Sequence, residues 1–113
     1  MKILQIGVGN FGKNHLRIWN ELREDLYVAD LSPKNLELCR TYNMPADRIT
    51  QDYHEFLPKV DAVDIITPTD SHFDLCRKSI EAGKDVFVEK PFTSTSREAA
   101  ELEDLAARKS RII

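Results

Sequence analysis

This chain of 113 residues has few of the features that mark metalloproteins, membrane proteins or nucleic-acid-binding proteins. Its two cysteines and three histidines are scattered and match no metal-ligand spacing. No apolar stretch reaches the roughly 20 residues that a membrane helix needs, and the first residues lead into a strand pattern without a signal-peptide pattern. A net charge of −3 gives no electrostatic reason to bind nucleic acid or an anionic membrane. We therefore expect a cytoplasmic globular protein with no metal, no nucleic-acid partner and no membrane association.

The two cysteines, Cys39 and Cys76, fall in two different segments with a helical pattern. In a sheet that carries helices on both faces, helices from the first and second halves of the chain cover opposite faces. The two thiols would then lie too far apart to form a disulfide. We expect both to be small buried hydrophobic side chains.

Glycine is scarce as well, and three of the four glycines, Gly7, Gly9 and Gly12, lie in one short segment after the first apolar run. If a strand ends here and a helix begins, Gly7 makes the tight turn, Gly9 leaves room for a pyrophosphate, and Gly12 lets the helix pack closely on the strand. The free N–H groups and the dipole of a helix that begins near Asn10 or Phe11 favour negative charge. The alternative is a glycine-rich turn without a ligand, because this motif alone is a weak signal.

A second apolar run, residues 26–29, ends in Asp30 at about the distance from the glycines where an acidic residue binds the ribose hydroxyls of a dinucleotide. A carboxylate there would repel a 2′-phosphate, so Asp30 favours NAD over NADP. Ser32 and Lys34, just beyond, could soften that preference. The alternative is a solvated aspartate at the end of a strand.

Strand and helix patterns alternate along the chain, which is typical of a parallel sheet with helices on both faces. The run 62–66 is mostly apolar and β-branched, as a central strand would be. In the first helix, the apolar stripe that we expect to lie on the sheet consists of Phe11, Ile18, Trp19 and Leu22. No repeat or linker interrupts the series, so we predict one doubly wound α/β domain, mostly parallel, over residues 1–113. The expected strands are residues 3–6, 26–29, 48–50, 62–66 and 85–88, with the opening of another at 111–113; the expected helices are residues 11–24, one from Ser32-Pro33, a single turn from Asp52 with Glu55 completing a capping box, residues 71–82, and one announced by Thr95 and Glu98.

Three motifs each follow an apolar strand: Gly7-x-Gly9-x-x-Gly12, Thr67-Pro68-Thr69 with His72, and Glu89-Lys90-Pro91. In this order and spacing they resemble the Gfo/Idh/MocA oxidoreductases, and the likeness covers essentially the whole chain. It covers only the N-terminal half of the family, whose members typically continue into a C-terminal α/β domain with a large open sheet. We expect that substrate domain, with its further catalytic residues and usual oligomer interface, to be absent here.

The resemblance also implies roles for individual residues. The turn Thr67-Pro68-Thr69 passes along the cofactor, and Glu89-Lys90-Pro91 faces the nicotinamide, with a cis bond before Pro91. Lys90 matches a catalytic lysine that contacts the substrate hydroxyl, and its charge would lower the pKa of that hydroxyl. His72 either holds its turn or contacts the cofactor. The expected cofactor contacts are Gly7, Val8, Gly9, Asn10, Phe11, Gly12, Asp30, Leu31, Thr67, Pro68, Thr69, His72, Glu89, Lys90 and Pro91, and the expected catalytic residue is Lys90.

The function implied is that of the NAD(P)-binding domain of an oxidoreductase that transfers hydride between nicotinamide and a sugar- or polyol-like hydroxyl. Alone, such a domain would have little or no dehydrogenase activity, because most of the substrate pocket is missing. Two alternatives are a non-catalytic module that binds or senses NAD(H), and one half of a split enzyme whose substrate domain is a separate chain. A third is a Rossmann-like domain that has lost its ligand or binds another nucleotide such as coenzyme A.

Overall fold

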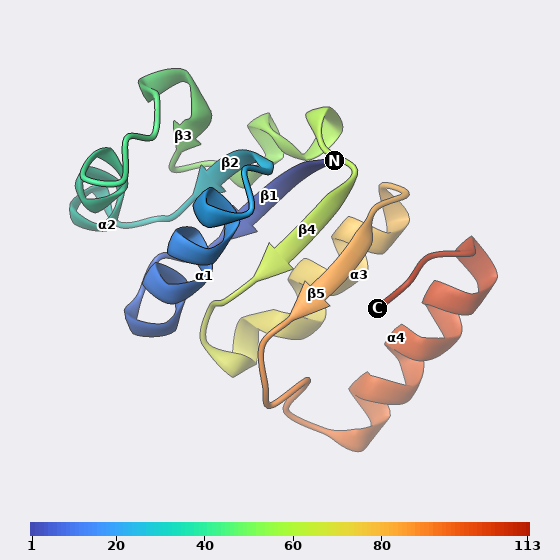
Figure 1. Ribbon diagram of the computed structural model, residues 1–113. Coiled ribbons are helices and arrows are strands. Elements are labelled where there is room, and N and C mark those ends of the chain that lie inside the picture. Colours follow the sequence, from blue (N-terminus) through green and yellow to red (C-terminus); the bar gives the residue numbers. More distant parts are fainter.

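The computed structural model describes residues 1–113 and contains a five-stranded sheet with α-helices on both faces (Figure 1). The strands are β1 (Lys2–Ile6), β2 (Asp25–Ala29), β3 (Ile49–Thr50), β4 (Ala62–Ile65) and β5 (Asp85–Val88). The α-helices are α1 (Asn10–Glu21), α2 (Pro33–Arg40), α3 (His72–Glu81) and α4 (Ser96–Lys109), and short 3₁₀ turns lie at Ala46–Arg48, Tyr53–Glu55, Leu57–Lys59 and Thr69–Ser71. The predicted doubly wound α/β fold is confirmed.

The strand order is β3-β2-β1-β4-β5, and every neighbouring pair is parallel. The sheet therefore grows outward from β1 through β2 to β3, after which the chain returns to the other side of β1 and adds β4 and then β5. Ile6 is in register with Ala29 of β2 and with Ile65 of β4, so the carboxyl ends of these three strands lie level. The reversal between β1 and β4 is the switch point at which open α/β sheets bind their ligands.

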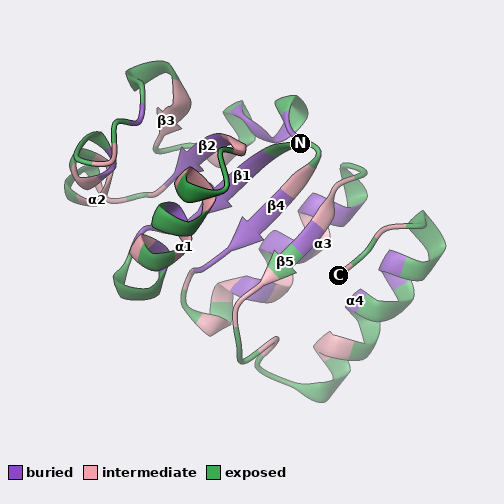
Figure 2. Cartoon of the chain, viewed as in Figure 1, coloured by how far each residue is buried: buried purple, intermediate pink, exposed green.

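Two hydrophobic cores lie on the two faces of the sheet, and β1 and β4 are buried along most of their length (Figure 2). The side chains of Leu16 and Cys39 place α1 and α2 on one face. Those of Cys76 and Leu102 place α3 and α4 on the other. Both cysteines are buried and free, on opposite faces as expected.

The apolar stripe predicted for the first helix is wrong except at Trp19, which is half-buried and packs against the core on this face of the sheet. Phe11 is 67% exposed and Leu22 60% exposed, whereas Gly12 and Leu16 are the buried residues of α1. The physical reason is the close approach of Gly12 to the turn after β1, which rotates α1 so that Gly12, Leu16 and the half-buried Trp19 face the sheet. A glycine contributes nothing to a hydrophobic pattern, so the pattern selected the neighbouring face.

Two further differences concern short segments. Asp52 does accept a hydrogen bond from the His54 N–H, but Glu55 bonds the Thr50 hydroxyl, so no reciprocal capping box forms. Residues 111–113 are not a strand, although the Ile112 carbonyl accepts a hydrogen bond from the Val86 N–H of β5 at 2.9 Å. No helix has the length and apolar character needed to cross a membrane.

Candidate functional site

A cleft of ≈ 740 Å³ opens at the carboxyl ends of the strands, over the switch point between β1 and β4. It is bounded by the turns after four strands and by one side of α3. Of the residues predicted to contact a cofactor, those that line it are Gly7, Gly9, Asp30, Leu31, Thr67 and Pro68.

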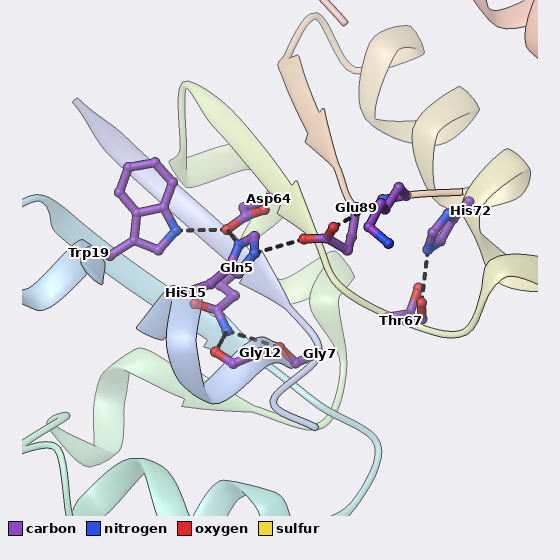
Figure 3. Close-up of polar contacts among 10 residues, drawn as sticks. Gln5, Gly7, Gly12, His15, Trp19, Asp64, Thr67, His72 and Glu89 are labelled. Carbon is purple, nitrogen blue, oxygen red and sulfur yellow. Dashed lines mark hydrogen bonds and ion pairs between the residues drawn. The ribbon is translucent and has the colours of Figure 1, made fainter. Parts of the chain in front are cut away.

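The conformation of the turn after β1 is stabilised by the Gln5 side chain. This side chain is fully buried, and its amide nitrogen donates hydrogen bonds to the carbonyls of Gly7, at 2.9 Å, and Gly12, at 2.8 Å (Figure 3). Gly7 has φ of +102°, a conformation that side chains other than glycine's rarely adopt. Gln5 was not among the predicted site residues, although a polar residue inside an apolar strand indicates a specific hydrogen-bonding role.

Gly9 differs from the other two glycines of the motif. A Cβ atom on Gly9 would meet nothing within 4 Å, so the space above this residue is open. Gly9 is also the N-cap of α1, and no side chain caps that helix. The first N–H groups of the helix are therefore left for water or for a bound anion, as a phosphate-binding turn requires.

Asp30 lies at the end of β2, inside the cleft. One of its carboxylate oxygens accepts a hydrogen bond from the Val8 N–H at 2.8 Å, and the other accepts one from the Ser32 N–H at 2.8 Å. The Asn35 amide adds a third at 3.2 Å. These donors fix the carboxylate beside the glycine turn, where a ribose would lie if a pyrophosphate sat over Gly9.

Twelve of the 18 residues that line the cleft were not among the predicted contacts. The far wall includes Gln51, Tyr53 and His54, which follow β3 directly. The same rule that selected the turns after β1, β2 and β4 applies to the turn after β3 and would have found them. The remaining wall comes from one face of α3 and the turn before it, with Ser71, Asp74, Leu75 and Lys78.

The turns after β4 and β5 are joined by His72. Its ring is buried, with Nε2 at 2.8 Å from the Thr67 carbonyl (Figure 3). The other ring nitrogen, Nδ1, lies 2.9 Å from the Pro91 carbonyl. Both ring nitrogens thus face main-chain oxygens, and the geometry supports the turn-holding role of the two that were considered. The Lys90–Pro91 peptide bond is cis, as the family resemblance implied.

Several predicted contacts lie outside the cleft. Val8, Asn10, Phe11 and Gly12 belong to the turn and first helical residues beside it, and Thr69, His72, Glu89 and Pro91 lie beyond its lining. Lys90 lines a second hollow of ≈ 490 Å³ next to β5, together with Phe87 and Phe92. No carboxylate lies within ion-pair distance of the Lys90 ammonium.

A group of polar side chains that was not predicted links α1 to the ends of β4 and β5. His15 lies between Asp64 and Glu89, and Trp19 also bonds Asp64 (Figure 3). The available signal was Asp64, a charged residue in the otherwise apolar run 62–66, because a buried charge needs partners.

Comparison with known proteins gives a consistent result. The family model described as "Oxidoreductase family, NAD-binding Rossmann fold" matches residues 1–113. An inositol 2-dehydrogenase of Paracoccus denitrificans is 32% identical over 96% of this chain and 35% of its own length. Among solved structures, a UDP-N-acetylglucosamine 3-dehydrogenase of Acidithiobacillus ferrooxidans has a TM-score of 0.88 at 30% identity, covering 98% of this chain and 35% of that one. An NAD-binding protein of Listeria innocua has a TM-score of 0.86 at 32% identity, covering 98% and 33%.

This chain thus spans about a third of the length of the relatives it matches. The family model, by contrast, is matched along the entire chain. The chain belongs to the Gfo/Idh/MocA oxidoreductase family, and its residues 1–113 form the NAD-binding Rossmann fold of that family.

Proposed function

We propose that the cleft binds NAD(H) with its pyrophosphate over Gly9, at the N-terminus of α1. The observation that carries this proposal is the combination of open space above Gly9 with a helix start that no side chain caps. A diphosphate placed there would accept hydrogen bonds from the free N–H groups and lie at the positive end of the helix dipole. The adenosine half would extend along Asp30 and Leu31 toward Gln51 and Tyr53, where the cleft continues.

NAD is the proposed cofactor rather than NADP because of Asp30. Its carboxylate is held in place by the Val8 and Ser32 N–H groups, so it cannot swing away from a ligand without losing them. Ribose hydroxyls can donate to the carboxylate, whereas a 2′-phosphate would bring negative charge against it. Lys34, which could have balanced that charge, is not part of the cleft lining.

The turn Glu89-Lys90-Pro91 is the proposed reaction end of the site. The Lys90 ammonium has no carboxylate partner and is therefore free to donate a hydrogen bond to a substrate hydroxyl, where its positive charge would lower the pKa of that hydroxyl and orient it. The bound nicotinamide would supply the hydride acceptor or donor. We propose a sugar- or polyol-like hydroxyl as the substrate class, since the named relatives act on inositol and on a UDP-amino sugar.

We assign these 113 residues to one dinucleotide-binding unit that turns over little or no substrate by itself. Nothing in the chain matches the other two thirds of its relatives' length, so few groups surround Lys90 to orient a substrate. The unit can therefore bind its cofactor without accelerating hydride transfer.

Isothermal titration calorimetry with NADH, NADPH and coenzyme A tests the proposal. One saturable site for NADH, with weaker binding of NADPH and none of coenzyme A, is the expected result. An absence of heat with both nicotinamide dinucleotides would overturn it. Equal affinity for NADH and NADPH would retain the dinucleotide site and remove the role given to Asp30.

A further inference from the structure

A polar cluster of His15, Trp19, Asp64 and Glu89 lies beside the cleft without lining it. His15 and Trp19 belong to α1, the helix that begins at the glycine turn, and Asp64 lies in β4. Glu89 immediately follows β5 and opens the turn that carries Lys90. The cluster therefore connects the proposed phosphate end of the site with its proposed nicotinamide end.

Asp64 is the only carboxylate among the buried residues, with 1% of its surface exposed. One of its oxygens accepts hydrogen bonds from His15 Nδ1 at 2.8 Å and from Trp19 Nε1 at 2.7 Å. Its other oxygen has no partner. A carboxylate buried in the centre of a sheet loses more solvation free energy than an apolar residue at the same position would. This cost indicates that the charge has a use beyond packing.

Both nitrogens of the His15 ring face carboxylate oxygens. Nδ1 lies 2.8 Å from Asp64 and Nε2 lies 3.0 Å from Glu89. Each of these hydrogen bonds needs one proton between nitrogen and oxygen. The three groups together must hold two protons, either as an imidazolium between two carboxylates or as a neutral imidazole with one protonated carboxyl.

From Glu89 the contacts continue into the turn. Its second oxygen accepts a hydrogen bond from the Lys90 N–H at 3.2 Å, and its own N–H donates to the Ile65 carbonyl of β4 at 2.9 Å. The carboxylate of Glu89 thus has one oxygen on His15 and one on the main chain that presents Lys90. Without the contact to His15, the Glu89 side chain would no longer be held in position to accept the hydrogen bond from the Lys90 N–H.

We propose that His15 is a positioning residue: shared between Asp64 and Glu89, it holds Glu89 against the Lys90 N–H and so fixes the turn that places Lys90 at the nicotinamide end of the site. This inference rests on the proposed function. Lys90 remains the residue that touches substrate, and His15 acts on it only through Glu89.

The groups around His15 agree with this role. Asp64 faces it from β4, Glu89 and then Lys90 from the turn after β5, and the Phe87 ring lies 6.0 Å away. Burial is the largest single influence on the ring and opposes its charge, but the hydrogen bonds and charges of Asp64 and Glu89 together raise the pKa of His15. The Lys90 N–H and then His15 lower the pKa of Glu89. The cluster therefore holds its bridging proton to a higher pH than a free histidine would.

Nuclear magnetic resonance of the whole chain, with and without NADH, tests the inference. The ring nitrogens of His15 and the main-chain N–H signals of Glu89 and Lys90 are followed from pH 5 to pH 9. We expect the ring to titrate above pH 6.5 and both N–H signals to shift with the same midpoint, because loss of the proton breaks one of the two ring hydrogen bonds.

Two variants and one control make the result specific. Glu89→Gln leaves the Asp64 contact intact and should lower the midpoint of the His15 ring by about one pH unit. His15→Gln should abolish the titration of both N–H signals in this range. The control is Arg17→Gln, which removes a charge from the exposed side of α1, where Arg17 pairs only with Glu21, and should leave the titration unchanged.

Two results would overturn the inference in a protein that still binds NADH. In the first, the N–H signals of Glu89 and Lys90 do not titrate with the His15 ring. In the second, they titrate unchanged in His15→Gln. If the His15→Gln protein does not fold, Glu89→Gln decides, and an unchanged ring midpoint overturns the inference. A chain that binds no NADH would overturn the proposed function and this inference with it.

Discussion

Gly12 lies directly against Gly7, so closely that a Cβ atom on Gly12 would stand 2.4 Å from the Gly7 carbonyl oxygen. Gly7 is confined in turn, since its own Cβ would stand 2.2 Å from the Ile66 carbonyl oxygen. Both contacts are with main chain, which cannot move aside as a flexible side chain can. The first and third glycines of the motif thus join α1 to the sheet, whereas Gly9 faces open space.

Alanine at these positions should separate folding from binding. Gly7→Ala and Gly12→Ala are each expected to lower the free energy of unfolding by about 1–3 kcal/mol or more, through overpacking and, at Gly7, a positive φ. The free energy of unfolding of Gly9→Ala should stay within about 0.5 kcal/mol of the wild-type value. This variant should nevertheless bind NADH more weakly, because its methyl group occupies the proposed phosphate position. Urea unfolding and calorimetry measure the two effects. A Gly12→Ala protein as stable as wild type would contradict the packing described here.

Asp30→Asn should weaken NADH binding about tenfold, the effect of losing one hydrogen bond to a charged group. It should also narrow the difference between NADH and NADPH, because the repulsion of the 2′-phosphate is removed. The matched control is Asp47→Asn, which makes the same change of charge at an exposed site outside the cleft. Equal loss of affinity in both variants would show a general charge effect and not a ribose contact.

Stability should fall as pH rises past neutrality. The folded protein holds the His15 proton more tightly than the unfolded chain, because Asp64 and Glu89 outweigh burial and raise the pKa of His15. The resulting stabilisation is complete below the ordinary histidine pKa of about 6.5 and is lost as pH rises through the higher folded value. Urea unfolding between pH 6 and pH 8 measures this slope. His15→Gln should flatten the slope, and an undiminished slope in that variant would assign it to other groups.

The two thiols should be unreactive in the folded protein. Burial raises the pKa of Cys76 to about 12, and burial together with the charge of Asp30 raises the pKa of Cys39 to about 11. Neither forms the reactive thiolate near pH 8. A thiol reagent such as Ellman's should modify no cysteine in the native state and both in denaturant. Rapid reaction of one thiol in the native protein would show that the helix covering it opens readily.

The sequence predicted the strands, the winding of the sheet and the glycine turn because each depends on local patterns. Short apolar runs that alternate with helical patterns identify β1, β4 and β5. The predicted helix starts at Ser32-Pro33 and Thr95 are also observed. Local patterns failed where an interaction joins distant segments. Nothing near His15 in the chain indicates that Asp64 and Glu89 will meet it, because that contact exists only once β4 and β5 lie side by side.

The same distinction explains the errors at the site. Gly7, Gly9 and Asp30 were found because a short motif carries them. The face of α3 in the cleft was not, because its side chains take part only through the position of the helix over the sheet. The mistaken stripe on α1 has a related origin: the burial of that helix is set by the absence of a side chain at Gly12.

The most direct test of the dinucleotide site is a titration of the nitrogen-15-labelled chain with NADH, followed by nuclear magnetic resonance. The N–H signals of residues 9–12, at the start of α1, and those around Asp30 and Thr67 are predicted to move together and to saturate at one equivalent of NADH. Saturable binding with shifts confined to another surface, or no shifts at all, would contradict the placement of the cofactor over Gly9.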